Sequence, residues 1–286
     1  MNNSGIKDQM NQGKLLYLDK DVAMTLQEYE HIESELLGLL DWEEKPLDLR
    51  LIAGAVWLDI LRDFVKAAAP PPGVDIERRK QVLDTFMETM KRERYERPFR
   101  IAAKPVHSTA MHRMFIGLFI SFRNHPEKRR SNLRTLFFIL SHYALSLFRI
   151  GGISMMPLER PFPFSAFRKY PLNITDRSLA EPLHSWAAKF IKEKKLLQAE
   201  NIRNAYFHLL LYFALIHWYA AGLAWGKNSS SLAQEHISGA IQLTEKYYVF
   251  HPCFEELFTF NPILKDIMDK AFHKKTCPMI LVRPPV

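Results

Sequence analysis

The amino-acid sequence predicts an all-α protein, a bundle of about eight to ten helices around one central apolar helix, with one long proline-rich and aromatic loop. The main observation is the stretch from Ala205 to Trp225, which contains no Asp, Glu, Lys or Arg although charged residues make up 24% of the chain. A helix that is apolar all round must be surrounded by other helices or by lipid. The chain also has only 11 glycines in 286 residues, which favours long helices over many short strands.

Polar atoms along this stretch favour surrounding helices over lipid. His208 and His217 lie within it, and Trp218 and Tyr219 lie well inside it, whereas membrane-spanning helices concentrate Trp and Tyr at their two ends. We therefore expect a buried core helix and no membrane span. The residues expected to be buried are Tyr212, Leu215, Ile216 and Tyr219.

The first part of the chain is expected to be a flexible arm, residues 1–18, followed by a single helical domain over residues 19–286. Asp21 is the expected cap of a helix that ends near Leu40, because a capping carboxylate accepts hydrogen bonds from the first unpaired backbone amides. The next helix is expected over residues 47–69, where apolar residues recur every three or four positions. Its apolar positions are Leu49, Ile52, Val56, Ile60 and Phe64, and its expected polar face carries Asp59, Arg62, Asp63 and Lys66.

Three further helices are expected before the middle of the chain. Asp75 begins a charged helix that ends near Arg97, and a helix over residues 108–124 follows it. Pro126 is tolerated in the first turn of a helix that runs to Ile150. Gly151 and Gly152 end that helix, because glycine enters the left-handed conformation at little cost. The buried side of the charged helix is expected to consist of Leu83, Phe86, Met87 and Met90.

The segment from Ile153 to Thr175 differs from the rest because prolines alternate with aromatic residues. Long loops in compact domains are uncommon and are often functional. The part from Pro161 to Tyr170, called the strap below, is therefore a candidate partner surface, and a sub-boundary of the domain is possible at residues 151–176. The alternative is that its aromatic residues only seal the edge of the core. These residues are Phe162, Phe164, Phe167 and Tyr170.

The last third of the chain is expected to be helical and to end in an extended tail. A helix is expected over residues 182–196, and Gly226 closes the apolar helix. Ser231 and Gln234 have the spacing of a capping box for a helix that ends near Phe250. Asn261-Pro262 predicts one more helix start, and the tail PMILVRPPV is expected to be extended.

Positive charge is concentrated between Arg78 and Arg134, where 15 Lys and Arg face 5 Asp and Glu, whereas the whole chain has a net charge of +8. A basic patch favours acidic or phosphate-bearing partners. We expect an acidic protein, because no nucleic-acid recognition motif is present. The alternative is a solvated surface, partly neutralised by the nine carboxylates of residues 19–44. The candidate partner-binding cations are Arg123, Lys128, Arg129, Arg130 and Arg134.

No arrangement of residues predicts catalysis or a metal site. Two pairs have the Glu-x-x-His spacing of di-iron bundles, Glu28 with His31 and Glu181 with His184. The first pair has acidic, solvated surroundings, marked by Glu30, Glu33 and Glu35, and Pro182 puts the second at a helix start. His208 and His217 are on opposite sides of one helix and cannot bind one metal. The two cysteines, Cys253 and Cys277, form neither a disulfide framework nor a zinc motif.

Three segments together resemble the helical C-terminal region of the flagellin lysine-N-methylase-like proteins, which are relatives of the cysteine-rich zinc/iron-chelating family. The segments are FRIGGISMMP at 148–157 leading into PFPFSAF, LLLYFALIHWYAAGLAW at 209–225, and SLAQEHISGAIQLTEKYYVFHPCFEELF at 231–258. The metal-holding cysteine cluster of that family has no counterpart here. The resemblance therefore implies the accessory half of such a methylation system and transfers no metal or catalytic residue.

These observations lead us to expect a non-catalytic helical binding or adaptor module, without a cofactor or metal. The start of the chain is polar and lacks the apolar run of a secretory signal, so a cytoplasmic location is expected. Two alternatives remain open at this point. One is the accessory half of a protein methylation system, and the other is a membrane-associated helical protein.

Overall fold

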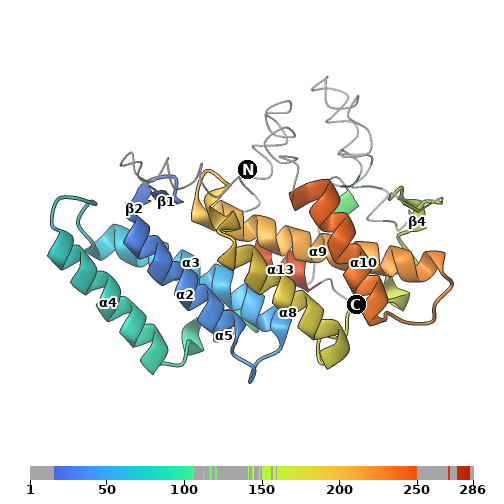
Figure 1. Cartoon of the computed structure of the whole chain (residues 1–286), viewed down its shortest axis with the longest axis horizontal. Coiled ribbons are helices and arrows are strands. Elements are labelled where there is room, and N and C mark those ends of the chain that lie inside the picture. The colour runs from blue at the N-terminus through green and yellow to red at the C-terminus, as the bar shows by residue number, and fades with distance from the viewer. Residues whose placement is uncertain are drawn as a thin grey trace. The chain divides into compact units, whose positions relative to one another are not determined.

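The structure is a computed structural model that describes residues 16–105, 112, 116–117, 120, 141, 144, 148, 150–155, 157–158, 160–249, 270 and 276–283. Over these residues the protein is all-α, as predicted, and its strands form only two short two-stranded sheets (Figure 1). Contacts divide the chain into two compact units. Unit 1 comprises Met1–Lys104 and Ala187–His208, and unit 2 comprises Pro105–Trp186 and Leu209–Val286.

Unit 1 begins with a hairpin that the sequence analysis missed. Strands β1 (Leu16–Asp19) and β2 (Val22–Met24) pair antiparallel and lead into helix α2 (Leu26–Leu40). The prediction that Asp21 caps this helix was wrong. Thr25 is the N-cap, and it forms a capping box in which the side chain of Glu28 accepts from the backbone amide of Thr25 at 2.8 Å. Because Thr25 and Glu28 satisfy both amides reciprocally, the helix starts there.

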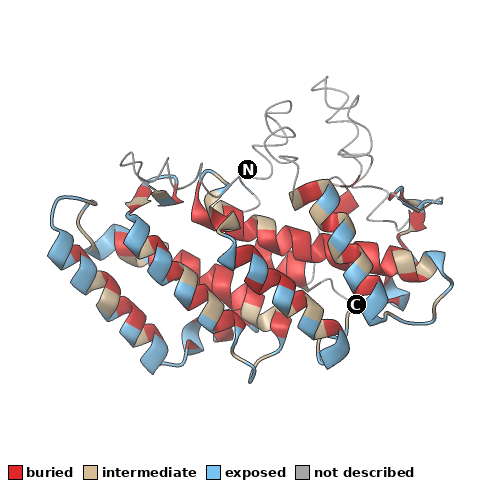
Figure 2. Ribbon diagram, in the orientation of Figure 1, coloured by how far each residue is buried: buried red, intermediate tan, exposed pale blue. Residues whose placement is uncertain are grey.

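Helix α3 (Leu47–Ala68) has the predicted extent but a wider buried surface than predicted. Residues 51–59 are buried without interruption, because α2, α4 (Ile76–Arg92) and α5 (Glu96–Ala102) all pack against α3 (Figure 2). The placement of Asp59 on a solvated face was therefore wrong. Leu49, Ile60 and Phe64, expected to be core positions, are only half-buried.

Helix α4 begins as predicted, with the Asp75 side chain accepting from the Arg78 amide at 3.0 Å. The four apolar residues predicted for its buried side, Leu83, Phe86, Met87 and Met90, are buried. The helix ends at Arg92 and does not continue to Arg97. Arg94 and Tyr95 both adopt left-handed backbone conformations, with φ of 48° and 52°, and α5 starts in a new direction.

Helices α8 (Arg177–Lys192) and α9 (Ile202–Gly226) follow, with a short 3-10 turn η3 (Lys195–Leu197) between them. Helix α8 starts before Pro182, because the Asp176 side chain accepts from the Ser178 amide at 2.9 Å. The prediction that Pro182 marks its first turn was wrong. In α9 the four residues predicted to be buried are buried. Among the described residues α9 is the one helix long and apolar enough to cross a membrane, and 89% of its apolar window is buried within the protein.

Unit 2 contains the strap. Gly151 has φ of 81°, as expected for a glycine ending a helix, and β3 (Gly152–Ile153) pairs antiparallel with β4 (Phe162–Pro163). The strap ends in a 3-10 turn, η2 (Phe167–Lys169). Most of the residues in the predicted helices 108–124, 126–150 and near Asn261 lie outside the described residues.

The C-terminal elements of unit 2 correct two predictions. Helix α10 (Gln234–Thr244) is capped by His236, whose Nδ1 accepts from the Ala233 amide at 3.0 Å, and not by a Ser231–Gln234 box. A π-helical turn, η4 (Glu245–Val249), follows α10. Part of the tail expected to be extended forms α13 (Cys277–Val282), because its apolar side chains are buried in unit 2.

Candidate functional site

The five cations predicted to bind a partner lie outside the described residues. They are Arg123, Lys128, Arg129, Arg130 and Arg134. The prediction for them rests on the sequence alone, but the basic segment in which they lie begins at Arg78, and residues 78–104 belong to unit 1. These residues carry nine Lys and Arg against four Asp and Glu, a net charge of +5.

The aromatic residues of the strap point into the core of unit 2. Phe162 and Phe164 are 0% and 1% exposed, and Phe167 stacks on Trp218 of α9 with ring centroids 4.1 Å apart. Phe162 contacts the same indole edge-on at 5.7 Å. Tyr170 is also buried, and its hydroxyl donates to the Ser229 carbonyl at 3.0 Å. The strap therefore does not offer these side chains as an exposed partner surface, and they seal the core as in the alternative interpretation.

Two buried histidines complete this aromatic cluster. Trp218 donates to Nε2 of His112 at 2.9 Å, so Nδ1 of His112 carries the proton and donates to the Ile280 carbonyl at 2.8 Å. His217 donates to the Tyr170 carbonyl at 3.0 Å, and burial lowers the pKa of His217 to about 4. Each ring nitrogen in these bonds connects two parts of unit 2, which indicates a structural role.

The carboxylates of the two Glu-x-x-His pairs both lie close to arginine side chains. Glu28 is engaged by Arg79, and Glu181 is exposed and lies 4.0 Å from Arg177. Glu35, expected among solvated neighbours of the first pair, is instead buried. Within the described part of the chain, no group of three or more His, Cys, Asp or Glu side chains is placed to hold a metal ion.

The strongest candidate site is an exposed cationic surface at the corner between α4 and α5, called the basic platform below. It consists of Arg92, Arg97, Arg100 and Lys104. All four residues are exposed, and none forms an ion pair with another described residue. Arg97 and Arg100 are one helical turn apart and so share a face of α5. The amide of Lys104 donates to the Ile101 carbonyl at 3.2 Å, which keeps Lys104 in the turn that follows.

Tyr95 fixes the backbone of this corner. Its amide donates to the Met90 carbonyl at 2.9 Å, and its buried hydroxyl donates to the Glu35 carboxylate, which also pairs with Lys91 at 2.5 Å. Burial, together with Glu35, raises the pKa of Tyr95 well above its ordinary value. These bonds hold Tyr95 in its left-handed conformation, a strained state that persists only where the surrounding structure determines it.

Helix α5 is fixed to unit 1 through its other face. Phe99 and Ala102 are buried, and Phe99 lies against Trp42 with ring centroids 6.3 Å apart. Trp42 also meets Tyr95 edge-on at 5.6 Å. The neighbouring cation Arg94 is engaged within unit 1, since it pairs with Glu44 at 2.8 Å and lies over the ring of Trp42. The platform cations therefore extend from a rigid base and are separate from the cations that stabilise it.

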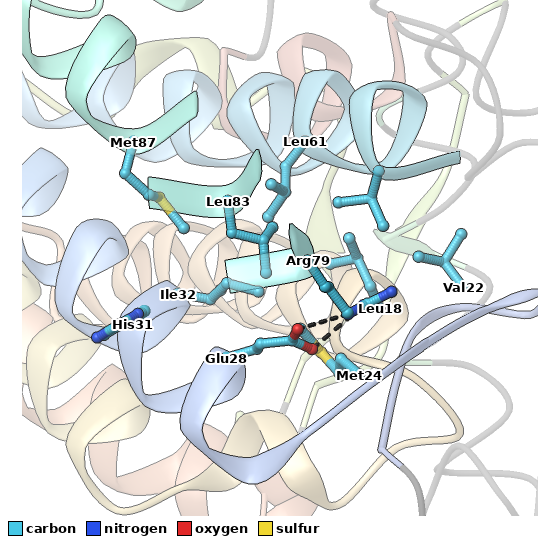
Figure 3. A pocket seen from close by; sticks show the side chains of 11 residues that line it. Leu18, Val22, Met24, Glu28, His31, Ile32, Leu61, Arg79, Leu83 and Met87 are labelled. Carbon is cyan, nitrogen blue, oxygen red and sulfur yellow. Dashed lines mark hydrogen bonds and ion pairs between the residues drawn. The ribbon is translucent and has the colours of Figure 1, made fainter. Parts of the chain in front are cut away.

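A second feature of unit 1 is a small apolar hollow between α2 and α4, floored by α3 (Figure 3). Arg79, which is 4% exposed, closes one end. Its guanidinium donates to Glu28 at 2.5 Å, to the Pro70 carbonyl at 2.6 Å and to the Ala23 carbonyl at 2.9 Å. One side chain thus joins the hairpin, α2 and the loop before α4. The lining residues are Leu18, Val22, Met24, Glu28, His31, Ile32, Leu61, Val65, Arg79, Leu83 and Met87.

Sequence reasoning located the basic segment but not the platform within it. The charge count from Arg78 to Arg134 contained the signal, and the spacing of Arg97, Arg100 and Lys104 could have been read as one helical face. The left-handed pair at Arg94 and Tyr95, which separates α5 from α4, has no sequence signal because neither residue is a glycine.

Comparison of the chain with protein-family models, with curated proteins and with solved structures found no match. The resemblance to the flagellin lysine-N-methylase-like proteins therefore remains a prediction from the sequence.

Proposed function

We propose that the chain is a non-catalytic helical binding module whose basic platform binds an acidic segment of a protein partner. The observation that carries the proposal is that Arg92, Arg97, Arg100 and Lys104 are all exposed and have no ionic partner among the described residues. The corner also carries the exposed carboxylates of Glu93 and Glu96, but the four cations leave it with a net positive charge, which attracts a partner rich in carboxylates.

Arginine suits this role because its planar guanidinium binds a carboxylate through two parallel hydrogen bonds. Three of the four platform residues are arginines. The buried aromatic anchor of α5 and the fixed Tyr95 reduce the ordering that binding would require, which favours affinity. In the sequence, the platform lies in the basic segment that runs from Arg78 to Arg134.

The buried charged groups of unit 1 support a structural rather than a catalytic interpretation. Glu28 is paired with Arg79, Asp59 with Arg203, and Glu35 with Tyr95 and Lys91. Each of these carboxylates accepts from side chains of other helices, so its hydrogen-bonding capacity serves the packing of unit 1. A general acid or base must instead reach a substrate.

The test is capture of partners from the native cell extract, with bound proteins quantified by mass spectrometry. Wild type is compared with the platform variant Arg97→Glu, Arg100→Glu, Lys104→Glu. The matched control is Arg177→Glu, Lys189→Glu, Lys192→Glu, which reverses the same number of exposed charges on α8. Both variants should stay folded, because exposed charges contribute little to stability.

We expect acidic proteins that are bound by wild type and by the α8 control and are lost from the platform variant. Equal capture by all three proteins would contradict the proposal. Loss of nuclease-sensitive material in place of acidic proteins would assign the platform to nucleic acid and would also contradict it.

A further inference from the structure

We propose that the junction between α9 and α10 is a pH-sensitive switch, in which protonation of the buried His236 ring removes the cap of α10 and opens the loop of residues 230–233. The junction lies within unit 2, so the switch is separate from the basic platform of unit 1. The hydrogen bonds of the two ring nitrogens, the charges that face the ring and the few other bonds of the loop all support it.

The ring of His236 can cap α10 only when it is neutral. The backbone amide of Ala233 donates to Nδ1 at 3.0 Å, and an amide N–H is always a donor, so Nδ1 must carry a lone pair. The proton of the neutral ring therefore lies on Nε2, which is 3.4 Å from the hydroxyl oxygen of Ser229. Protonation adds a hydrogen at Nδ1 that points at the amide hydrogen of Ala233, and this removes the cap.

Ser229 and His236 do not form a nucleophile and its base. A histidine that activates a serine must accept the hydroxyl proton on the nitrogen that faces the serine. Here that nitrogen is Nε2, which already carries a proton, so the Ser229 hydroxyl accepts from the ring. The acid–base chemistry of His236 therefore acts on the helix cap.

The surroundings of His236 disfavour the charged ring. The residue is only 3% exposed, and burial lowers the pKa of His236 below its ordinary value of 6.5. His236 is also the third residue of α10, and a cation at a helix N-terminus is opposed by the helix dipole. Once protonated, the ring is therefore more stable in solvent than in its place beside the start of the helix.

Two charged side chains face the ring among the described residues, and they oppose each other. The Glu235 carboxylate, on α10 itself, lies 3.4 Å from Nε2 and favours the charged ring. Lys227, which follows α9, disfavours the charged ring and is paired with the same carboxylate at 3.0 Å. The strap contributes the uncharged hydroxyl of Tyr170, which donates to the Ser229 carbonyl. Because the two charges act in opposite directions, burial determines the direction of the pKa shift.

The rest of α10 is held independently of the cap. Ile237 and Ala240 are completely buried. Gly239 packs closely on α9, since a Cβ added to it would lie 3.2 Å from a methyl group of Leu223. Loss of the cap therefore opens the start of α10 and leaves the following turns in place.

The loop of residues 230–233 has few other fixed points. Ser229 is held at the end of α9, because its amide donates to the Ala224 carbonyl at 2.8 Å and its carbonyl accepts from the Tyr170 hydroxyl at 3.0 Å. Beyond Ser229, in the described part of the chain, His236 is the one side chain that is hydrogen-bonded to residues 230–233. This stretch is largely exposed, so it gains backbone freedom when that bond is lost.

The experiment follows the backbone amides of the full chain by 15N NMR between about pH 7.5 and about pH 4. The amide of Ala233 reports on the cap, and the amides of Ile237 and Ala240 report whether the rest of α10 stays folded. The test variant is His236→Gln, because glutamine at the third helical position caps a helix without titrating. The matched control is His31→Gln, which removes an exposed histidine of unit 1.

We expect the Ala233 amide signal of wild type and of His31→Gln to move upfield in one titration step, centred below pH 6.5. Across that step, hydrogen exchange of the Ala233 amide should become at least about tenfold faster than the change in pH alone explains, while Ile237 and Ala240 stay protected. Neither change should occur in His236→Gln. The same step in His236→Gln, no step in wild type, or loss of protection along all of α10 would each overturn the proposal.

Two variants of exposed charges test the mechanism without changing the ring. Glu235→Gln removes the carboxylate that favours the charged ring and should move the midpoint of the titration to lower pH. Lys227→Gln removes the cation that disfavours the charged ring and should move the midpoint to higher pH. Shifts in the same direction in both variants, or no shift in either, would show that His236 is not the titrating group and would also overturn the proposal.

Discussion

The carboxylate of Asp59 and the guanidinium of Arg203 are joined at 2.6 Å inside unit 1, and both side chains are almost completely buried. Arg203 also lies over the ring of Phe207, one turn further along α9. Arg62 approaches the same carboxylate at 3.3 Å and links it to Asp19 of the hairpin. The buried pair therefore couples α3 to α9, and the half-buried Arg62 extends the connection to the hairpin.

Removing one partner of this ion pair should destabilise unit 1 more than replacing both partners by apolar side chains. Asp59→Ala leaves Arg203 charged and buried, at an expected cost of about 3–5 kcal/mol in the free energy of unfolding. The double variant Asp59→Leu, Arg203→Met replaces both charges by apolar side chains and should cost less. Urea denaturation of the two variants, compared with wild type, gives the difference. A double variant that is less stable than Asp59→Ala would show that the ion pair itself is not the source of the effect.

Two glycines of unit 2 should differ in how much stability their replacement by alanine costs. A Cβ on Gly152 would lie 2.5 Å from the backbone carbonyl oxygen of Phe162, so the strap would have to move. We expect Gly152→Ala to cost about 1–3 kcal/mol, as overpacking does. A Cβ on Gly222 meets two side-chain ends, the Met155 methyl at 2.3 Å and a Leu158 methyl at 2.9 Å, and these flexible ends can shift where a backbone carbonyl cannot.

Alanine at Gly222 is also favoured in a helix by up to about 1 kcal/mol, so Gly222→Ala should be close to neutral. Thermal unfolding, followed by near-ultraviolet circular dichroism, distinguishes the two variants. If Gly152→Ala were as stable as Gly222→Ala, the close approach of the strap to β3 would not constrain the fold.

The buried His217 should make the protein sensitive to mild acid. Burial lowers the pKa of His217 from 6.5 to about 4, so below pH 6.5 the unfolded chain binds a proton that the folded chain does not. The stabilising contribution of the neutral ring is full above pH 6.5 and is lost as the pH falls toward 4. For one histidine the loss approaches about 3 kcal/mol.

His217→Asn removes this titration while keeping a donor for the Tyr170 carbonyl. Urea denaturation at about pH 7.5 and about pH 4.5 should show a smaller loss of stability in the variant than in wild type. An equal loss in both proteins would mean that His217 is not protonated on unfolding.

The sequence predicted the fold class and the core helix because those signals are local. The charge-free run of α9 and the periodicity of α3 and α4 follow from the pattern of side chains alone. The cap of α2 was missed because Asp21 and Thr25 are both good capping residues, and the hairpin that separates them depends on pairing over β1 and β2. The burial of Asp59 could not be predicted, because its partner Arg203 is distant in the sequence.

The candidate site could be predicted only in part from the sequence. Charge counting identified residues 78–134, but exposure of Arg97 and Arg100 depends on how Phe99 and Ala102 pack. For the strap, the pattern of prolines and phenylalanines was correctly recognised as unusual. Whether the phenylalanines of the strap point into the core or toward solvent could not be deduced, since the position of Trp218 beneath Phe162 and Phe167 is a tertiary contact.

The central claim is that the basic platform recognises acidic protein segments, and direct binding of a short peptide rich in aspartate and glutamate tests it most closely. Fluorescence anisotropy at about 0.15 M salt compares wild type, the platform variant and the α8 control, with a lysine-rich peptide as the second probe. The account predicts that wild type and the α8 control bind the acidic peptide with similar Kd, and that the platform variant binds it at least about tenfold more weakly. Equal weakening in the platform variant and the α8 control, or no binding by wild type, would contradict it.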